Sequence, residues 1–266
     1  DKGKSWTDLV ALESPDGVES SYAVLLKTPG GRIYCFYNHN TDNIRRIIAD
    51  KSAYPNGFCS RVDSLGYFVF KYSDNNGKSW SSKRYNIDVG EMAIDRENPY
   101  GGKIRFFWNV GKPFIYQDIA YVPLNKVGAI GRGFFTRSEG VLLKSENILT
   151  ETNPEKIRWQ TLPDGDAGLK TPPGGGPIAE EQSYSVMSDG SFFCVYRSKD
   201  GHPVCAYSKD NGHTWTEPEY MSYKPHGRKI KNPRAANFAW KCSNGRYLYW
   251  FHNHSGKNYE DRNPVW

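Results

Sequence analysis

The sequence predicts an all-β fold, a β-propeller built from four-stranded antiparallel blades, of which about four are present. Three observations predict it. The 266 residues include 8 Trp, 18 Tyr, 13 Phe, 26 Gly and 16 Pro, a composition typical of many short strands joined by tight turns. A nine-residue turn motif recurs, and so does the strand pair that precedes it. Repetition of one small supersecondary unit with four strands is typical of propeller blades.

The recurring turn reads YSDNNGKSW at residues 72–80 and YSKDNGHTW at residues 207–215. The opening DKGKSW, at residues 1–6, matches the last six positions of the same motif. In each full copy an Asn or Asp can hydrogen-bond its own turn backbone, a Gly tolerates positive φ, and a Trp supplies a large apolar anchor. The motif therefore predicts a stapled β-turn between two strands, and not a catalytic loop.

Upstream of the turn, two segments share a strand, a Gly-containing turn and a returning aromatic strand with a Cys. They are ESSYAVLLKTPGGRIYCFYN from Glu19 and EQSYSVMSDGSFFCVYR from Glu181. Residues 232–254 hold a third copy, and a weaker one runs from residue 112 to residue 163. Counting these units predicts one partial propeller domain with a blade remnant at 1–17, blades at about 18–98, 99–165 and 166–225, and half a blade at 226–266.

Antiparallel order places the starts of the first strands and the ends of the second strands at one edge of every blade, and the stapled turns at the opposite edge. Ionisable residues gathered from several blades at one edge are what a polar ligand site needs, although each taken singly is also consistent with a solvated loop charge. The residues expected at this edge are Glu19, His39, Lys112, Lys126, Glu181, Arg197, Arg234, His252, His254 and Arg262.

Glu181 and Arg197 are the strongest pair of this set, at the start of the first strand and the end of the second strand of one unit. Arg197 ends a strand that is apolar on both faces, so its charge needs a partner. Glu181 is the candidate, as part of a ligand site or as a structural ion pair alone. His252 and His254 alternate on a strand and suit sugar contacts. We expect no metal there, because no third ligand is evident.

These repeats resemble the Asp-box, or BNR, repeats of the sialidase superfamily, most closely from Glu181 to Trp215. The chain is most similar to bacterial sialidase-like BNR proteins described as exo-sialidases. The resemblance implies a six-bladed propeller and a glycoside hydrolase that is exo-acting on terminal sialic acid or a related anionic sugar of glycans. It implies that Glu181 assists a Tyr nucleophile, the known exception among glycosidases.

The resemblance also implies an arginine triad that binds the carboxylate of the substrate. Arg197 matches the second triad arginine, Arg262 is the candidate for the third, and Arg234 is the runner-up. A planar guanidinium offers paired donors that match a carboxylate better than a lysine does. His252 and His254 are further candidates for sugar contact.

The same resemblance predicts that the chain is a fragment and is inactive by itself. The family's first triad arginine and its acid/base Asp precede the first Asp-box, and its nucleophilic Tyr follows the third arginine, so none of the three is expected here. Two alternatives stay open. One is a propeller glycosidase or lyase that acts on another sugar, and the other is a non-catalytic glycan-binding propeller.

Charge and hydropathy limit the other partners. The net charge of +6 mildly favours an anionic ligand, while the densest basic stretch, HGRKIKNPR at residues 226–234, is interpreted as a solvated loop and not as a nucleic-acid site. A mean hydropathy of −0.71 without a long apolar run excludes a membrane-spanning helix. Five scattered Cys disfavour a zinc ribbon or a redox motif, and no cofactor is expected. We expect the full-length protein to be secreted, periplasmic or on the cell surface.

Overall fold

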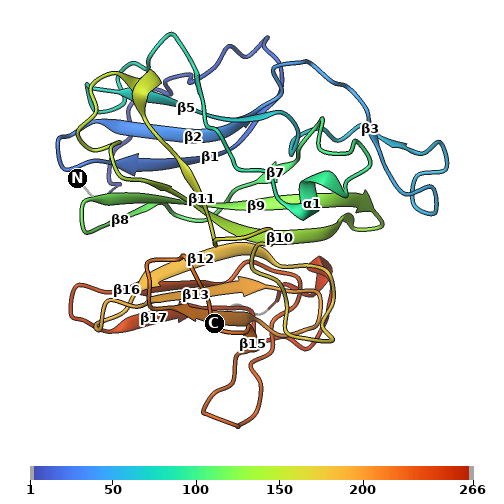
Figure 1. Cartoon of the computed structure of the whole chain (residues 1–266). Helices are drawn as coiled ribbons and strands as arrows, with labels where there is room; N and C mark the ends of the chain where they lie inside the picture. Colours follow the sequence, from blue (N-terminus) through green and yellow to red (C-terminus); the bar gives the residue numbers. More distant parts are fainter. Residues whose placement is uncertain (1–2, 264–266) are drawn as a thin grey trace.

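The computed structural model describes residues 3–263 and is built almost entirely of β-strands, which confirms the predicted all-β class (Figure 1). The first two residues of the opening DKGKSW motif lie outside the described residues, as do residues 264–266 of the half blade. The only α-helix in the described part is the single turn α1 (Ala93–Arg96). None of the described helices has the length and apolar character needed to cross a membrane.

Two sheets are four-stranded antiparallel meanders, in which every strand pairs with the next strand of its sheet along the chain. This is the arrangement that the repeat predicts for a blade. One sheet contains β1 (Ser20–Lys27), β2 (Ile33–His39), β5 (Tyr67–Ser73) and β6 (Tyr85–Asn86). The other contains β12 (Glu180–Val186), β13 (Phe192–Arg197), β14 (Val204–Ser208) and β15 (Glu219–Tyr220).

A five-stranded sheet lies between these two, and a two-stranded sheet follows them (Figure 1). The central sheet contains β7 (Phe107–Trp108), β8 (Phe114–Tyr116), β9 (Ile119–Gly131), β10 (Phe134–Ser145) and β11 (Gln160–Leu162). The last sheet pairs β16 (Phe238–Lys241) with β17 (Tyr247–Trp250). The remaining elements are the small hairpin of β3 (Ile47–Ile48) and β4 (Phe58–Cys59) and the 3-10 turns η1 (Pro154–Lys156) and η2 (Tyr259–Asp261).

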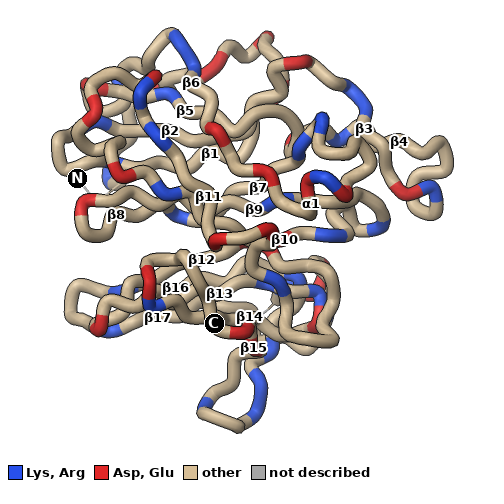
Figure 2. Tube along the Cα trace, viewed as in Figure 1, with Lys and Arg blue, Asp and Glu red and all other residues tan. Residues whose placement is uncertain are grey.

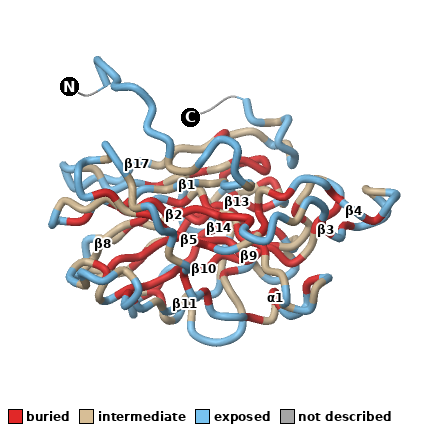
Figure 3. Tube along the Cα trace, turned by 90° about the horizontal axis from the view of Figure 1, so that it is seen from above, coloured by how far each residue is buried: buried red, intermediate tan, exposed pale blue. Residues whose placement is uncertain are grey.

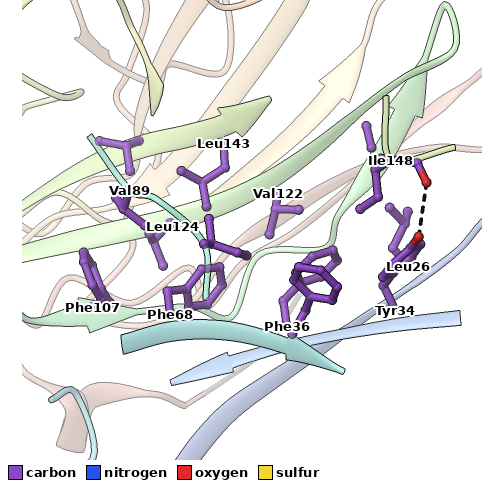
Figure 4. Close-up of a cluster of buried hydrophobic side chains, with 14 of the residues drawn as sticks. Leu26, Tyr34, Phe36, Phe68, Val89, Phe107, Val122, Leu124, Leu143 and Ile148 are labelled. Atoms are coloured by element: carbon purple, nitrogen blue, oxygen red, sulfur yellow. Dashed lines mark hydrogen bonds between the residues drawn. The ribbon is translucent and has the colours of Figure 1, made fainter. Parts of the chain in front are cut away.

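The largest apolar core lies between the first sheet and the central sheet (Figure 4). Aromatic side chains of the first sheet, among them Phe36 and Phe68, pack against the aliphatic side chains of Val122 and Leu124. The hydroxyl of Tyr34 donates a hydrogen bond to the backbone oxygen of Ile148, so this buried phenol is satisfied. Inner strands are buried on both faces, as expected for strands that pack between neighbouring sheets, and exposure is concentrated in the loops (Figure 3).

The two complete turn motifs adopt the same stapled geometry. In the second copy, Ser208 Oγ accepts a hydrogen bond from the backbone N–H of Gly212 (2.8 Å), and Asp210 Oδ1 accepts one from the N–H of Thr214 (2.9 Å). The first copy repeats both bonds between residues 73 and 77 and between residues 75 and 79. The indole of Trp215 packs edge-on against Tyr184, which anchors the turn to the neighbouring strand β12.

The loop before β5 approaches the end of β2 closely at Gly66, and substitution of this glycine tests the contact. Its φ is +108°, and a Cβ built on it would lie 2.2 Å from the backbone oxygen of His39. Gly31 is a matched control, because its φ is +93° and a Cβ there would meet nothing within 4 Å. We expect Gly31→Ala to lower the free energy of unfolding by about 1 kcal/mol through backbone strain alone. Gly66→Ala should lower it by about 3 kcal/mol or more, since the backbone must also move.

Urea denaturation of the two variants measures this difference. Equal losses of stability in Gly66→Ala and Gly31→Ala would show that the close approach between Gly66 and His39 does not exist.

Candidate functional site

The candidate site begins where β12 starts and β13 ends. Glu180 pairs in register with Arg197, and the next two residues of β12 bulge outward opposite Tyr196. Glu181 is the first residue of this bulge, with a φ of +61°. A bulge re-aims the side chains around it, and this one directs two consecutive glutamates toward the same arginine.

Glu180, which is fully buried, is the centre of the ion pairs. Its carboxylate accepts hydrogen bonds from Arg197 Nε (2.9 Å) and Arg234 Nη2 (2.8 Å), and Arg197 Nη2 lies 2.8 Å from it. Glu181 Oε1 lies 3.0 Å from Arg197 Nη1. The predicted pairing of Glu181 with Arg197 is therefore present, but sequence reasoning missed Glu180. The doublet of glutamates at the start of the strand was the available signal, because a buried guanidinium has more donors than one carboxylate accepts.

Arg234 and Arg262 complete the cluster. Arg234 is buried and also donates to the backbone oxygens of Gly133 (3.1 Å) and Phe135 (2.9 Å), at the hairpin between β9 and β10. The exposed Arg262 donates to the backbone oxygen of Arg234 through Nε (3.2 Å) and Nη2 (2.9 Å). We call Glu180, Glu181, Arg197, Arg234 and Arg262 the arginine cluster. With all side chains ionised, three guanidiniums face two carboxylates, which leaves one positive charge.

The two carboxyl groups have pKa values shifted in opposite directions. Burial raises the pKa of Glu180, but Arg197 and Arg234 together outweigh it, so the net shift is downward. Burial also raises the pKa of Glu181, which Arg197 only partly offsets, so the net shift is upward. Glu181 Oε2 is buried without a hydrogen-bond partner, which agrees with the poorer stabilisation of this charge. The two neighbouring carboxylates thus differ in their affinity for a proton, and Glu181 is the one better suited to accept it.

These opposite shifts predict opposite pH dependences for two neighbouring variants. As the pH rises above 4.5, the unfolded chain loses the Glu181 proton before the folded protein does. The free energy of unfolding of wild type therefore falls, while that of Glu181→Gln, which has no proton to lose at this position, does not. For Glu180 the folded protein loses the proton first, so wild type gains stability between the lowered pKa and 4.5, and Glu180→Gln does not. Relative to wild type, Glu181→Gln should become more stable with rising pH and Glu180→Gln less stable.

Urea unfolding of both variants and wild type from about pH 3.5 to about pH 7 measures the two slopes. The assignment is contradicted if both differences change in the same direction with pH.

The two histidines lie next to the cluster in different ways. His252 is buried, its backbone N–H donates to Asn232 Oδ1 (3.0 Å), and its Nδ1 has no partner. Burial lowers the pKa of His252, so its imidazole is held neutral. His254 lies in the following loop, where its Nδ1 accepts from the N–H of Gly256 (3.0 Å). Both histidines follow the end of β17 and so do not alternate on a strand as predicted. His252 lies beside Arg262, and His254 Nδ1 lies 4.0 Å from Asp261 Oδ1.

Four residues expected at the same edge do not join the cluster. Lys126 was expected at the rim and instead is fully buried, paired with Asp95 of α1 and hydrogen-bonded to the backbone oxygen of Gly90. Lys112 lines the same cleft as Ser183 and Tyr184 in the middle of β12, because the edge of the central sheet is divided between β7 and β8 and Lys112 falls in the segment that joins them. The other two, Glu19 and His39, hydrogen-bond locally to Ser21 and Ser20.

The structure shifts the alignment of the two repeats, which the sequence had matched at Glu19 and Glu181, by three residues. The bulge of β1 begins at Tyr22, with a φ of +61°, and lies opposite Tyr37, just as the bulge of β12 begins at Glu181 and lies opposite Tyr196. Tyr22, and not Glu19, is therefore the counterpart of Glu181. The 16 positions from Tyr22 to Asn38, equal to those from Glu181 to Arg197, were the signal that could have found it.

Tyr22 belongs to a second polar group beside the arginine cluster. Its hydroxyl donates to Asp63 and accepts from Arg61 Nη2 (3.2 Å), and its ring lies 4.2 Å, centroid to centroid, from that of Trp108. Trp108, from β7, also lies beside Glu181. Four polar side-chain atoms of these residues and of the neighbouring site are buried without a hydrogen bond of good geometry: Asp63 Oδ1, Trp108 Nε1, Glu181 Oε2 and His252 Nδ1. Trp108 is nevertheless close enough to Glu181 to favour its ionised form. Buried polar atoms without a partner are rare in folded proteins and are common where a ligand supplies the missing partner.

The described residues contain no group of three or more His, Cys, Asp or Glu side chains placed to hold a metal ion.

The fold matches solved structures at low sequence identity. A protein of unknown function from Dyadobacter fermentans superposes with a TM-score of 0.61 at 16% identity, covering 94% of this chain and 61% of that one. A sialidase from Trypanosoma rangeli superposes with a TM-score of 0.53 at 12% identity, covering 89% and 34%. The NanB sialidase from Streptococcus pneumoniae superposes with a TM-score of 0.51 at 11% identity, covering 89% and 44%.

The fold is sialidase-like. This chain spans less than two thirds of the length of each of these three structures. No protein-family model and no curated protein matches the sequence. At these identities the likeness concerns the fold alone.

Proposed function

We propose that this chain acts in a glycoside hydrolase of the sialidase type, exo-acting on terminal sialic acid or a related anionic sugar of glycans. In this proposal the sheets are blades of a six-bladed propeller, and the arginine cluster binds the carboxylate of the sugar. The sialidase-like fold supports the class of protein.

The observation that carries the proposal is the excess of positive charge in the arginine cluster. Arg197 and Arg234 are buried and held by Glu180. Arg262 is exposed, donates to a backbone oxygen and lies 5.8 Å from the ring centroid of Tyr259, and it has no carboxylate partner among residues 3–263. Burial and the neighbouring Arg197 lower the pKa of Arg262, as expected for a cation crowded by like charge. A carboxylate bound beside Arg262 would balance the cluster and accept paired hydrogen bonds from a planar donor.

Glu181 is the group that we propose to assist a Tyr nucleophile. Its raised pKa and its free Oε2 suit a carboxylate that accepts a phenolic proton during attack. Among residues 3–263, however, no tyrosine hydroxyl is hydrogen-bonded to Glu181, and the hydroxyl of Tyr22 is directed to Asp63. We therefore expect the 266-residue chain to bind the sugar without releasing it from a fluorogenic sialoside. Release of the fluorophore by this chain would contradict that expectation.

Arg197→Lys tests the proposed function by binding. Lysine keeps the charge but not the planar donor pair, so the affinity for N-acetylneuraminic acid should fall about tenfold while that for neutral N-acetylglucosamine changes little. Titration followed by NMR measures both affinities, and urea unfolding confirms that the variant is folded. Equal losses for the two sugars would favour a glycan-binding propeller, or a glycosidase of another sugar, over the sialidase type.

A further inference from the structure

The net positive charge of the protein comes from one segment of the sequence. Residues 220–259 contain eight Lys and Arg and no Asp or Glu. The other 226 residues contain 27 basic and 29 acidic residues and are slightly acidic, although the whole chain carries +6. Charge separated in this way along a chain usually marks a surface that meets an anionic partner.

A β-hairpin at residues 221–231, which we call the basic arm, projects beyond β15 (Figures 1 and 2). Three backbone hydrogen bonds order it: Tyr223 N–H to Arg228 O (3.1 Å), Gly227 N–H to Lys224 O (2.9 Å) and Ile230 N–H to Met221 O (2.8 Å). Lys224, Arg228 and Lys229 are exposed, and the ion pairs of the described residues include none of the three. The arm is therefore an ordered surface whose three cations have no carboxylate partner among the described residues.

The basic arm lies at the same end of the sheets as the arginine cluster. The chain leaves the arm at Lys231 and continues through Asn232 to Arg234, and Asn232 Oδ1 accepts a hydrogen bond from the backbone N–H of His252. The hydroxyl of Tyr223 donates to Asn253 Oδ1 (3.2 Å), which ties the arm to the loop after β17. A ligand that enters the cluster would therefore extend naturally along the arm.

The aromatic rings of the arm are covered by its own cations. The guanidinium of Arg228 lies 4.9 Å from the ring centroid of Tyr223, and Lys229 Nζ lies 4.6 Å from that of Tyr220. Proteins that bind single-stranded nucleic acid stack the bases on open aromatic rings, and these two rings are occupied. The surface suits a polyanion that is recognised by charge without base stacking.

We propose that the basic arm binds the chain of an acidic polysaccharide whose terminal sugar acid occupies the arginine cluster. The nature of the terminal sugar rests on the proposed function, whereas the charge and position of the arm do not. The carboxylates of successive sugars pair with Lys224, Arg228 and Lys229 in exposed contacts that salt screens strongly. Among the described residues, neither Glu219, at the base of the arm, nor Asp200, which accepts a hydrogen bond from Tyr220, forms an ion pair with these cations.

A triple variant, Lys224→Gln with Arg228→Gln and Lys229→Gln, tests the proposal on the full chain. The control variant also removes three positive charges, but at the opposite end of the sheets. It combines Lys78→Gln, Lys156→Gln and Lys209→Gln, all at exposed positions. The probes are polysialic acid, monomeric N-acetylneuraminic acid, neutral dextran and single-stranded oligothymidine, measured by calorimetry at low and high salt. We expect the arm variant to bind polysialic acid about tenfold more weakly than wild type and the control variant to bind nearly as wild type does.

Each outcome has a distinct meaning. Loss of polymer affinity in the arm variant alone, with unchanged binding of the monomer, supports the inference. Equal losses in both triple variants, or oligothymidine binding as tight as that of polysialic acid, overturn it. Binding of the polymer through the arm without any binding of the monomer would support the role of the arm in polymer binding and would contradict the proposed function.

Discussion

Glu180→Ala is expected to lower the free energy of unfolding by about 3–5 kcal/mol, the largest effect of any single substitution that we consider. The side chain of Glu180 has no exposed area, and it compensates two guanidiniums that are themselves buried. Its removal leaves Arg197 with Glu181 alone and Arg234 without a carboxylate. An uncompensated buried charge is far more costly than a lost surface pair.

The same substitution tests a link between distant parts of the chain. Through Glu180, the strand pair β12 and β13 is joined to Arg234 in the segment before β16, and Arg234 in turn holds the hairpin between β9 and β10. Glu180→Gln keeps the shape and part of the hydrogen bonding, so it should lose less stability than Glu180→Ala and fold where the alanine variant does not. Unfolding in guanidinium chloride at neutral pH measures the free energy of unfolding of wild type and of both Glu180 variants.

Glu155→Ala is the control for this prediction. Glu155 pairs with Lys83 on the surface, where both side chains are more than half exposed, so its loss should leave the unfolding midpoint unchanged. Loss of stability in Glu180→Ala no greater than in Glu155→Ala would mean that Glu180 is not the buried centre of the arginine cluster.

Much of the fold follows from local sequence signals. The turn motif fixes its own geometry through side chains only two to four residues apart, such as Ser208 with Gly212, and so it is legible without tertiary information. The need of Arg197 for a partner is likewise legible, because a charge at the end of an apolar strand cannot remain buried alone.

The rest of the site depends on register, which the sequence does not reveal. A shift by one residue turns a side chain to the opposite face of a sheet, so the bulge after Glu180 decides where Glu180 and Glu181 point. The equivalence of Tyr22 with Glu181 was hidden because the first repeat has three more residues between its opening Glu19 and Asn38, the counterpart of Arg197. Lys126 was misplaced because its partner, Asp95, comes from an insertion that the repeat does not contain.

Arg262→Ala should abolish the preference of the protein for a negatively charged sugar. Arg262 is the exposed member of the arginine cluster and the only one without a carboxylate partner within the described residues. A charge-assisted hydrogen bond contributes about 1.5–3 kcal/mol, which corresponds to a tenfold or larger change in affinity. Because the side chain lies at the surface, its removal should not change the stability of the fold.

The most direct measurement compares one ligand with and without its charge. The methyl α-glycoside of N-acetylneuraminic acid and the methyl ester of the same glycoside differ only in the carboxylate, and both are titrated into wild type and Arg262→Ala. We predict that wild type binds the acid about tenfold or more tightly than the ester and that Arg262→Ala binds both with nearly equal affinity. Equal affinities of the acid and the ester for wild type would contradict a carboxylate-binding arginine cluster.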